Sequence, residues 1–111
     1  MTTSRTIAQA EWRTFFDRLS DLVSGKEIEI EAASIDLGDQ IVAEWVPLNG
    51  ITYDANDDLI DVSLKGLSHL IRHPRQILVQ EGAHGVETVA VATEDQGRQI
   101  LRLRDPMVMP A

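Results

Sequence analysis

Four residues whose side chains suit the binding of an anion or a metal ion lie within one short segment: His69, Arg72, His73 and Arg75. Two histidines four residues apart face the same side of a helix, where they can serve together as metal ligands. Pro74, however, disfavours a helical conformation at His73, and no glutamate lies between the two histidines to act as a general base. The pair is therefore not sufficient to predict a metal site, and we expect no metal and no cofactor.

The arginines of this segment also suit the binding of carboxylate or phosphate groups. An anion or small-molecule site would combine the segment with a nearby acidic loop, and its candidate residues are His69, Arg72, His73, Arg75, Asp54 and Asp58. No glycine-rich phosphate loop accompanies them. The alternative is that the cations face water or pair with acidic segments from the first half of the chain. We favour this second interpretation because most charge clusters are solvated or paired.

The acidic loop itself begins like a calcium-binding loop, with Asp54, Asn56 and Asp58 at alternate positions. The sixth position of that motif needs a glycine and is Leu59 here, and the twelfth needs a glutamate and is Lys65 here. A hairpin turn in which Asp54 and Asn56 hydrogen-bond the local backbone explains the loop better.

Composition and charge exclude several classes of function. The formal net charge is −8, and the charge is unevenly distributed. Residues 1–64 contain 4 Lys/Arg and 13 Asp/Glu, whereas residues 65–111 contain 6 Lys/Arg and 5 Asp/Glu. A negative chain is a poor nucleic-acid binder, and the absence of cysteine excludes disulfides and cysteine nucleophiles. There is no membrane-length apolar run and no secretion signal, so we expect a cytoplasmic protein. No G-x-S-x-G motif is present, and we predict no catalytic residues.

One amphipathic helix must position the other elements, and it is predicted at about residues 7–24. Its apolar stripe recurs in steps of three and four and includes Trp12, Phe15, Phe16 and Leu19. Thr6 and Gln9 have the form of a capping box at its start.

The period of the apolar residues changes to two after the helix, which is typical of strands. Strands are predicted at about 26–34, 39–47, 50–53, 59–65, 75–81, 86–93 and 98–104. The alternation is interrupted near Trp45, which predicts a bulge or an edge strand that ends at Pro47. The pattern predicts a single α+β domain over residues 1–111: an N-terminal amphipathic helix packed on an antiparallel, meander-like sheet of about five to seven strands.

The sheet face that the helix does not cover is predicted to carry large apolar side chains, and such a face commonly becomes an interface. The last strand adds a basic row, which is complementary to the acidic row Glu27, Glu29 and Glu31 of the first strand. The two rows meet either across adjacent strands of one sheet or between two copies of the chain. The candidate interface residues are Trp45, Leu78, Ile100, Arg102 and Arg104.

The chain resembles a family of short uncharacterised bacterial proteins, domain of unknown function family 5335, in four segments: AEWRTFFDRLS, PLNGITYDANDDLIDV, LIRHPRQI and GRQILRLRDP. The likeness covers nearly the whole chain, and the YD-x-x-DD and HP-R-x-I segments are its most distinctive parts. The resemblance implies a single-domain bacterial protein, and it assigns no catalytic residues.

We therefore expect a non-catalytic domain that acts through protein–protein interaction, either as a homodimer or with another protein as its partner. The alternative is a small-molecule, anion or metal-binding protein, an enzyme included, that uses the segment from His69 to Arg75 and the loop from Asp54 to Asp58.

Overall fold

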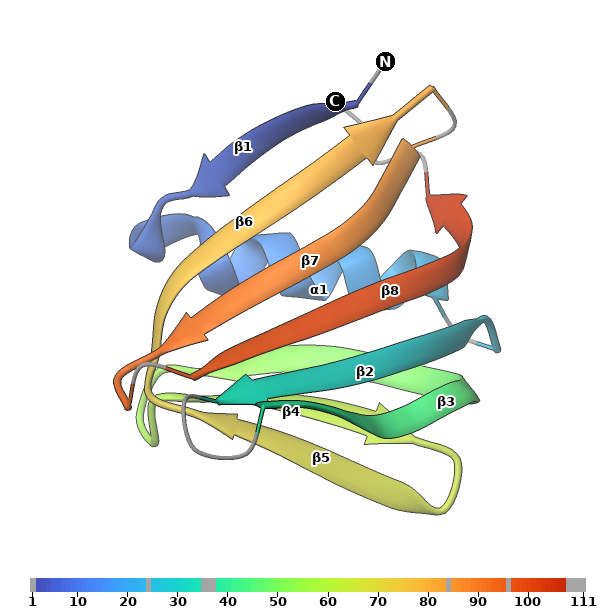
Figure 1. The fold of residues 1–111 in the computed structure, drawn as a ribbon. Helices are drawn as coiled ribbons and strands as arrows, with labels where there is room; N and C mark the ends of the chain where they lie inside the picture. The colour runs from blue at the N-terminus through green and yellow to red at the C-terminus, as the bar shows by residue number, and fades with distance from the viewer. Residues whose placement is uncertain (1, 24, 35–37, 84, 96, 108–111) are drawn as a thin grey trace.

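The structure is a computed structural model that describes residues 2–23, 25–34, 38–83, 85–95 and 97–107. In these ranges the chain forms eight strands, one α-helix and one short 3-10 turn: β1 (Thr3–Ile7), η1 (Gln9–Glu11), α1 (Trp12–Val23), β2 (Glu27–Ser34), β3 (Gly38–Asp54), β4 (Leu59–Leu64), β5 (Leu67–Arg72), β6 (Pro74–Gly82), β7 (Gly85–Thr93) and β8 (Arg98–Met107). All strand pairs are antiparallel, and the order across the sheet is β1-β6-β7-β8-β2-β3-β4-β5 (Figure 1). Two meanders, β6-β7-β8 and β2-β3-β4-β5, are thus joined where β8 pairs with β2.

The helix is shorter than the sequence predicted, and a strand precedes it. Thr6 pairs with Leu78 of β6, so the predicted capping box of Thr6 and Gln9 is wrong. Ala8 precedes the first turn and provides no side-chain hydrogen bond to it. Strand β1 was missed because its partner β6 is distant in the sequence and only Ile7 of β1 is buried. Ser24, the predicted last residue of the helix, lies outside the described residues.

The sheet has eight described strands, not five to seven. Strand β5 was not predicted, and the predicted strands 39–47 and 50–53 are one continuous strand, β3. The predicted bulge near Trp45 is confirmed, because the register shifts between the pairs Ile28–Val46 and Ile30–Ala43. The extra residue bends β3, which continues past Pro47 and pairs with β4 instead of ending there.

The core lies between α1 and the inner face of the sheet (Figure 1). The helix stripe is buried as predicted at Trp12, Phe15, Phe16 and Leu19. The strands contribute the alternate residues that the period of two predicted, among them Ile28, Ile30, Ile60, Val62, Leu64, Ile77, Val79, Leu101 and Leu103. Each such side chain stabilises the fold by about 1.5–3 kcal/mol through burial. No helix in the described ranges is long and apolar enough to cross a membrane.

A single residue, His73, connects the edge strand β5 to β6 on the other side of the sheet. Its N–H donates a 2.8 Å hydrogen bond to the carbonyl of Asp58, and its own carbonyl accepts a 3.0 Å bond from the N–H of Glu94. Because one residue spans only about 3.5 Å, the end of β5 lies next to the start of β6. The sheet is therefore strongly curved.

Candidate functional site

The basic row of β8 lies next to the acidic row of β2 within one chain. Arg102 Nη1 is 3.0 Å from Glu29 Oε1 and 2.7 Å from Glu31 Oε1. Arg104 Nη1 is 2.6 Å from Glu27 Oε1. The hydrogen bond from Arg102 is the main cause that lowers the pKa of Glu31. Partly exposed pairs of this kind contribute less than about 1 kcal/mol each, so their main effect is to favour the observed β2–β8 register.

Trp45 is held by the same network at the bulge of β3. The guanidinium of Arg104 lies over the Trp45 ring, 5.0 Å from its centroid, as in a cation–π contact. Trp45 also has a φ of 50°, which is rare for a bulky side chain. Three of the five predicted interface residues, Trp45, Arg102 and Arg104, therefore have partners within the chain.

The other two predicted interface residues lie in one cross-strand row on the outer face. Leu78 of β6 is opposite Ala90 of β7, and Ala90 is opposite Ile100 of β8. All three side chains are half-buried and line a shallow hollow of about 220 Å³ with Arg98 and Arg102 beside it. This hollow is smaller than the roughly 300–1,000 Å³ of typical small-molecule sites.

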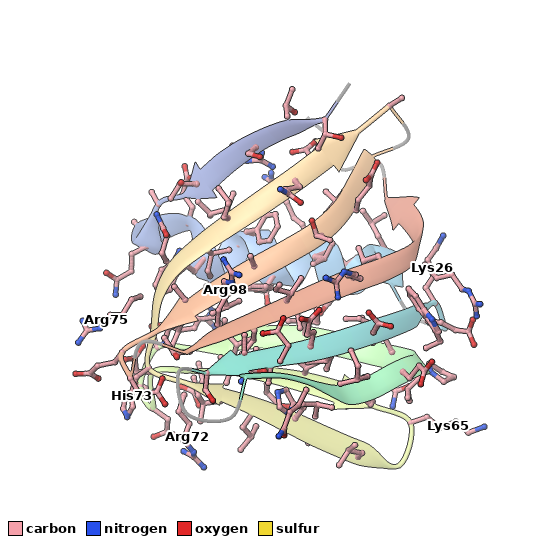
Figure 2. All side chains as sticks on the ribbon, viewed as in Figure 1. Lys26, Lys65, Arg72, His73, Arg75 and Arg98 are labelled. Atoms are coloured by element: carbon pink, nitrogen blue, oxygen red, sulfur yellow. The ribbon has the colours of Figure 1, made fainter. Side chains whose placement is uncertain are left out.

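The predicted anion-binding segment does not converge on one point. His69 Nε2 lies 2.8 Å from Oε1 of Gln99 on β8, whereas Arg75 Nη2 forms an ion pair of 2.9 Å with Glu94 Oε1. Arg72 and Arg75 extend away from the sheet in different directions (Figure 2). The Arg72 guanidinium has no hydrogen-bond or ion-pair partner among the described residues. The segment thus supplies separate structural contacts and one unpaired cation.

Asp58 is the point where the acidic loop meets this segment. Asp58 Oδ1 accepts a 2.9 Å hydrogen bond from the Tyr53 hydroxyl, and its Oδ2 lies 3.4 Å from Nδ1 of His73. Burial and, second, the bond to Asp58 raise the pKa of Tyr53. Asp58 and His73 both have left-handed backbones, with φ of 49° and 54°. These contacts hold the β3–β4 turn against the β5–β6 connection, and they explain why two strained residues are tolerated there.

The remaining candidate of the loop, Asp54, forms the turn that the sequence predicted. Its Oδ1 accepts hydrogen bonds from the N–H groups of Asn56, at 2.9 Å, and Asp57, at 3.3 Å. Among the residues that the structure describes, no three His, Asp or Glu side chains are grouped so that they could hold a metal ion. Asp54 and Asp58 do not line the same cavity as Arg72.

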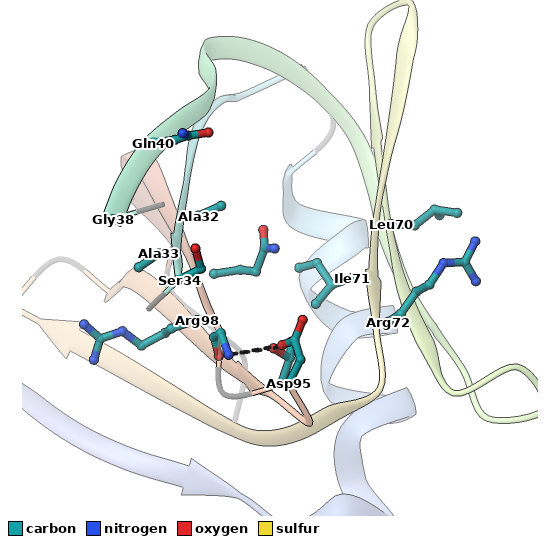
Figure 3. Close-up of a pocket in the computed structure, with 13 residues that line it drawn as sticks. Ala32, Ala33, Ser34, Gly38, Gln40, Leu70, Ile71, Arg72, Asp95 and Arg98 are labelled. Carbon is teal, nitrogen blue, oxygen red and sulfur yellow. Dashed lines mark hydrogen bonds between the residues drawn. The ribbon is translucent and has the colours of Figure 1, made fainter. Parts of the chain in front are cut away.

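A cavity of about 350 Å³ opens between β5, the ends of β2 and β3 and the turn from β7 to β8 (Figure 3). Ile71 and Ala32 form part of its apolar lining, and Gln99, the partner of His69, adds a polar group. Arg72 and Arg98 flank it with side chains that extend away from each other (Figure 3). The cavity is large enough for a small molecule, but its two cations do not point to a common centre.

Sequence reasoning missed three polar residues of this cavity as a group: Asp95, Arg98 and Gln99. Asp95 Oδ1 accepts a 2.5 Å hydrogen bond from the Thr93 hydroxyl and a 3.1 Å bond from the N–H of Gly97, and both lower its pKa. The letters TEDQG do signal this turn in the sequence. The cavity itself depends on the curvature of the sheet, which local patterns do not encode.

The large apolar side chains that the described structure leaves exposed lie on free strand edges. Leu67 and Leu70, 53% and 40% exposed, belong to β5, the last strand of the sheet. Ile41 and Val42, 52% and 42% exposed, belong to the first half of β3. One edge of this half is free, because pairing with β4 begins only at Leu48. Strand edges with exposed apolar groups favour pairing with another chain.

Comparisons with known proteins match almost the whole chain. The model of the Family of unknown function (DUF5335) matches residues 3–111. An uncharacterized protein of Aquifex aeolicus (strain VF5) is 32% identical over 108 residues, which cover 96% of this chain and 97% of that protein. No solved structure matches the chain.

Proposed function

Because the chain belongs to the family of unknown function DUF5335, we propose its function from its own surfaces: it is a non-catalytic domain that acts through protein–protein interaction, primarily with a second copy of itself. The observation that carries this proposal is the position of the four exposed large apolar residues on two free strand edges. An edge of this kind presents unpaired backbone groups together with apolar side chains, which is the surface that strand addition uses.

The polar residues support a non-catalytic role. Asp54 binds the backbone of its own turn, Asp58 binds Tyr53 and His73, and Arg75 is paired with Glu94. Residues in such contacts already have structural partners. A catalytic set would instead bring a nucleophile, a base and a charge-stabilising group to one cavity.

Sedimentation velocity over a wide range of protein concentrations tests the proposal. We expect the unmodified chain to form dimers and Leu70→Lys to weaken them, because a charge on an edge strand opposes pairing. Ile100→Lys places the same charge on the outer face and is the matched control. A monomer at every concentration would contradict self-association. Dissociation by Ile100→Lys alone would move the interface to the row of Leu78, Ala90 and Ile100.

A second candidate function is the binding of a small anion in the cavity beside β5. The guanidinium of Arg72, which has no partner among the described residues, favours it, together with the amide of Gln99 in the same lining. Inorganic phosphate and short-chain carboxylates are then expected to raise the melting temperature, since a ligand that binds only the folded state stabilises it. Arg72→Gln is expected to abolish the rise, whereas Arg13→Gln, at a different hollow, is expected to preserve it. An equal response in both variants would argue for nonspecific salt effects.

A further inference from the structure

We infer that two copies of the chain join edge to edge through β5, antiparallel, with Leu70 of one copy opposite Leu70 of the other. The inference rests on the proposed self-association and specifies its geometry. Strand β5 is the last described strand of the sheet and pairs only with β4 among the described strands. The result is one continuous sheet with a two-fold axis at Leu70, an isologous interface.

One backbone hydrogen bond fixes which groups of β5 are free. The N–H of His73 donates to the carbonyl of Asp58 at 2.8 Å, and these two residues continue the register in which Arg72 is opposite Leu59. Hydrogen-bonded and non-hydrogen-bonded pairs alternate along an antiparallel ladder. Residues 67, 69 and 71 therefore turn their N–H and C=O groups to β4. Residues 68, 70 and 72 turn theirs to the open edge.

Strand β5 lacks the features that protect most edge strands. Its ladder with β4 is regular over all six residues, without a bulge, and it contains neither proline nor lysine. Leu70, which carries outward-facing backbone groups, has a side chain that is 40% exposed. The opposite edge strand, β1, is five residues long, and its single large apolar residue, Ile7, is buried. Regular edges with exposed apolar side chains pair with other strands, so β5, with Leu67 and Leu70 exposed, is the edge expected to do so.

The free backbone groups select the register. With Leu70 opposite itself, Ser68 of each copy is opposite Arg72 of the other, and all three outward-facing residues form hydrogen-bonded pairs, giving roughly six bonds. A shift of two residues in one direction places Pro74, which has no N–H, opposite Ser68. A shift in the other direction places Gly66, in the turn before β5, opposite Arg72. A shift of one residue is excluded because it would exchange the two faces of the sheet.

The side chains agree with this register. Leu70 packs on its copy, and the half-exposed leucine surface is covered. Arg72, whose guanidinium has no partner among the described residues, lies opposite Ser68 of the second copy, on the face that also carries Asp61. Asp61 Oδ1 is buried and has no hydrogen-bond partner among the described residues. Residues 68, 70 and 72 share this face in the single chain, so the pairing adds the guanidinium of the second copy to a face that already carries Arg72 and Asp61.

Single cysteines test the register, because the chain has no cysteine of its own. Opposite residues of a hydrogen-bonded pair have Cα atoms about 5.5 Å apart, a separation that a disulfide spans. Under mild oxidation we expect Leu70→Cys to form covalent dimers. Ser68→Cys is the matched control on the same strand and face. Its two copies would be about four residues apart along the strands, roughly 13 Å, and we expect no link.

Three outcomes are distinguishable when the same samples are sedimented without oxidant. Faster linking of Leu70→Cys in a self-associating chain supports the inference. A self-associating chain in which Ser68→Cys links as fast overturns the register but leaves the proposed function intact. A monomeric chain overturns both. Leu70→Pro adds an independent check, since it removes an outward N–H without removing a bond to β4. A Leu70→Pro protein that remains dimeric, with unchanged circular dichroism, would also overturn the inference.

Discussion

The hydroxyl of Ser20 binds both backbone polar groups of Ile51: it donates to the carbonyl and accepts a 2.6 Å hydrogen bond from the N–H. This contact ties the C-terminal half of α1 to the part of β3 that pairs with β4. The two elements are close here, since a Cβ atom at Gly50 would be in van der Waals contact with the Ser20 hydroxyl oxygen at 3.4 Å. The helix and the bent strand are thus joined by a polar contact at the edge of an apolar core.

Replacing Ser20 by alanine is expected to destabilise the protein by about 1–3 kcal/mol, because the N–H of Ile51 would lose its partner in a partly buried position. Urea unfolding followed by tryptophan fluorescence measures the change. Thr14→Ala, on an exposed position of the same helix, is the control and is expected to change stability by no more than about 0.5 kcal/mol. An equal effect of both substitutions would indicate that helix propensity, not the contact with Ile51, explains the loss.

The ion pairs of Arg102 make the stability of the folded protein depend on pH. The pKa of Glu31 is lowered in the folded protein, chiefly by its hydrogen bond to Arg102. The stabilisation is therefore present above the ordinary pKa of 4.5 and is lost as the pH falls through the lowered value. We expect Arg102→Gln to reduce the melting temperature at pH 7 more than at pH 3. Arg18→Gln, on the helix surface, is expected to show no such difference between the two pH values.

Asp39 is expected to behave in the opposite way. Hydrogen bonding with Glu31, followed by the repulsion of its charge, raises the pKa of Asp39. The folded state therefore favours the protonated form, and ionisation of Asp39 costs stability as the pH rises above 3.8. Asp39→Asn is expected to raise the melting temperature at pH 7 and to leave it unchanged at pH 3. A lower melting temperature at pH 7 would show that the carboxylate of Asp39 is stabilising.

Local patterns predicted the parts of the fold that depend on neighbours in the sequence. The stripe from Trp12 to Leu19 and the alternation around Ile28 and Ile30 are buried as predicted, because each reflects a single element with one wet and one dry face. Strand β1 could not be predicted in this way, since its hydrogen-bond partners are residues of β6. Strand β5 was missed although Gly66, with a φ of 77°, marks the tight turn that precedes it.

The candidate site was harder to predict than the fold. His69 and Arg75 are close in the sequence, yet they contact Gln99 and Glu94 on different elements. Alternation turns successive side chains of β5 to opposite faces, and the connection at His73 then carries the chain to another part of the sheet. Proximity in the sequence is therefore a poor guide to a shared site here. The acidic row Glu27, Glu29 and Glu31 does form ion pairs with the basic row of β8. Complementary charges on two strands favour the pairing of those strands.

Tyr53 offers a direct measurement of the contact at Asp58, because it is the single tyrosine of the chain. Burial and the hydrogen bond to Asp58 raise its pKa above 10.0. Neutral Tyr53 is therefore favoured in the fold, and this stabilisation is lost as the pH rises through the raised pKa. Tyrosinate absorbance, read immediately after jumps to alkaline pH, is expected to give a midpoint above 10.0.

The variant Asp58→Asn separates the two causes of the raised Tyr53 pKa, burial and the contact with Asp58. It removes the negative charge next to the hydroxyl while Tyr53 stays buried against Trp12, whose ring lies edge-on at 5.3 Å. The midpoint is expected to fall towards the ordinary value without reaching it. His73→Asn removes the other contact of Asp58, suits the left-handed backbone at that position and is expected to leave the midpoint high. If Asp58→Asn left the midpoint unchanged, burial alone would account for the raised pKa, and the bond between Tyr53 and Asp58 would have no measurable part in holding the turn.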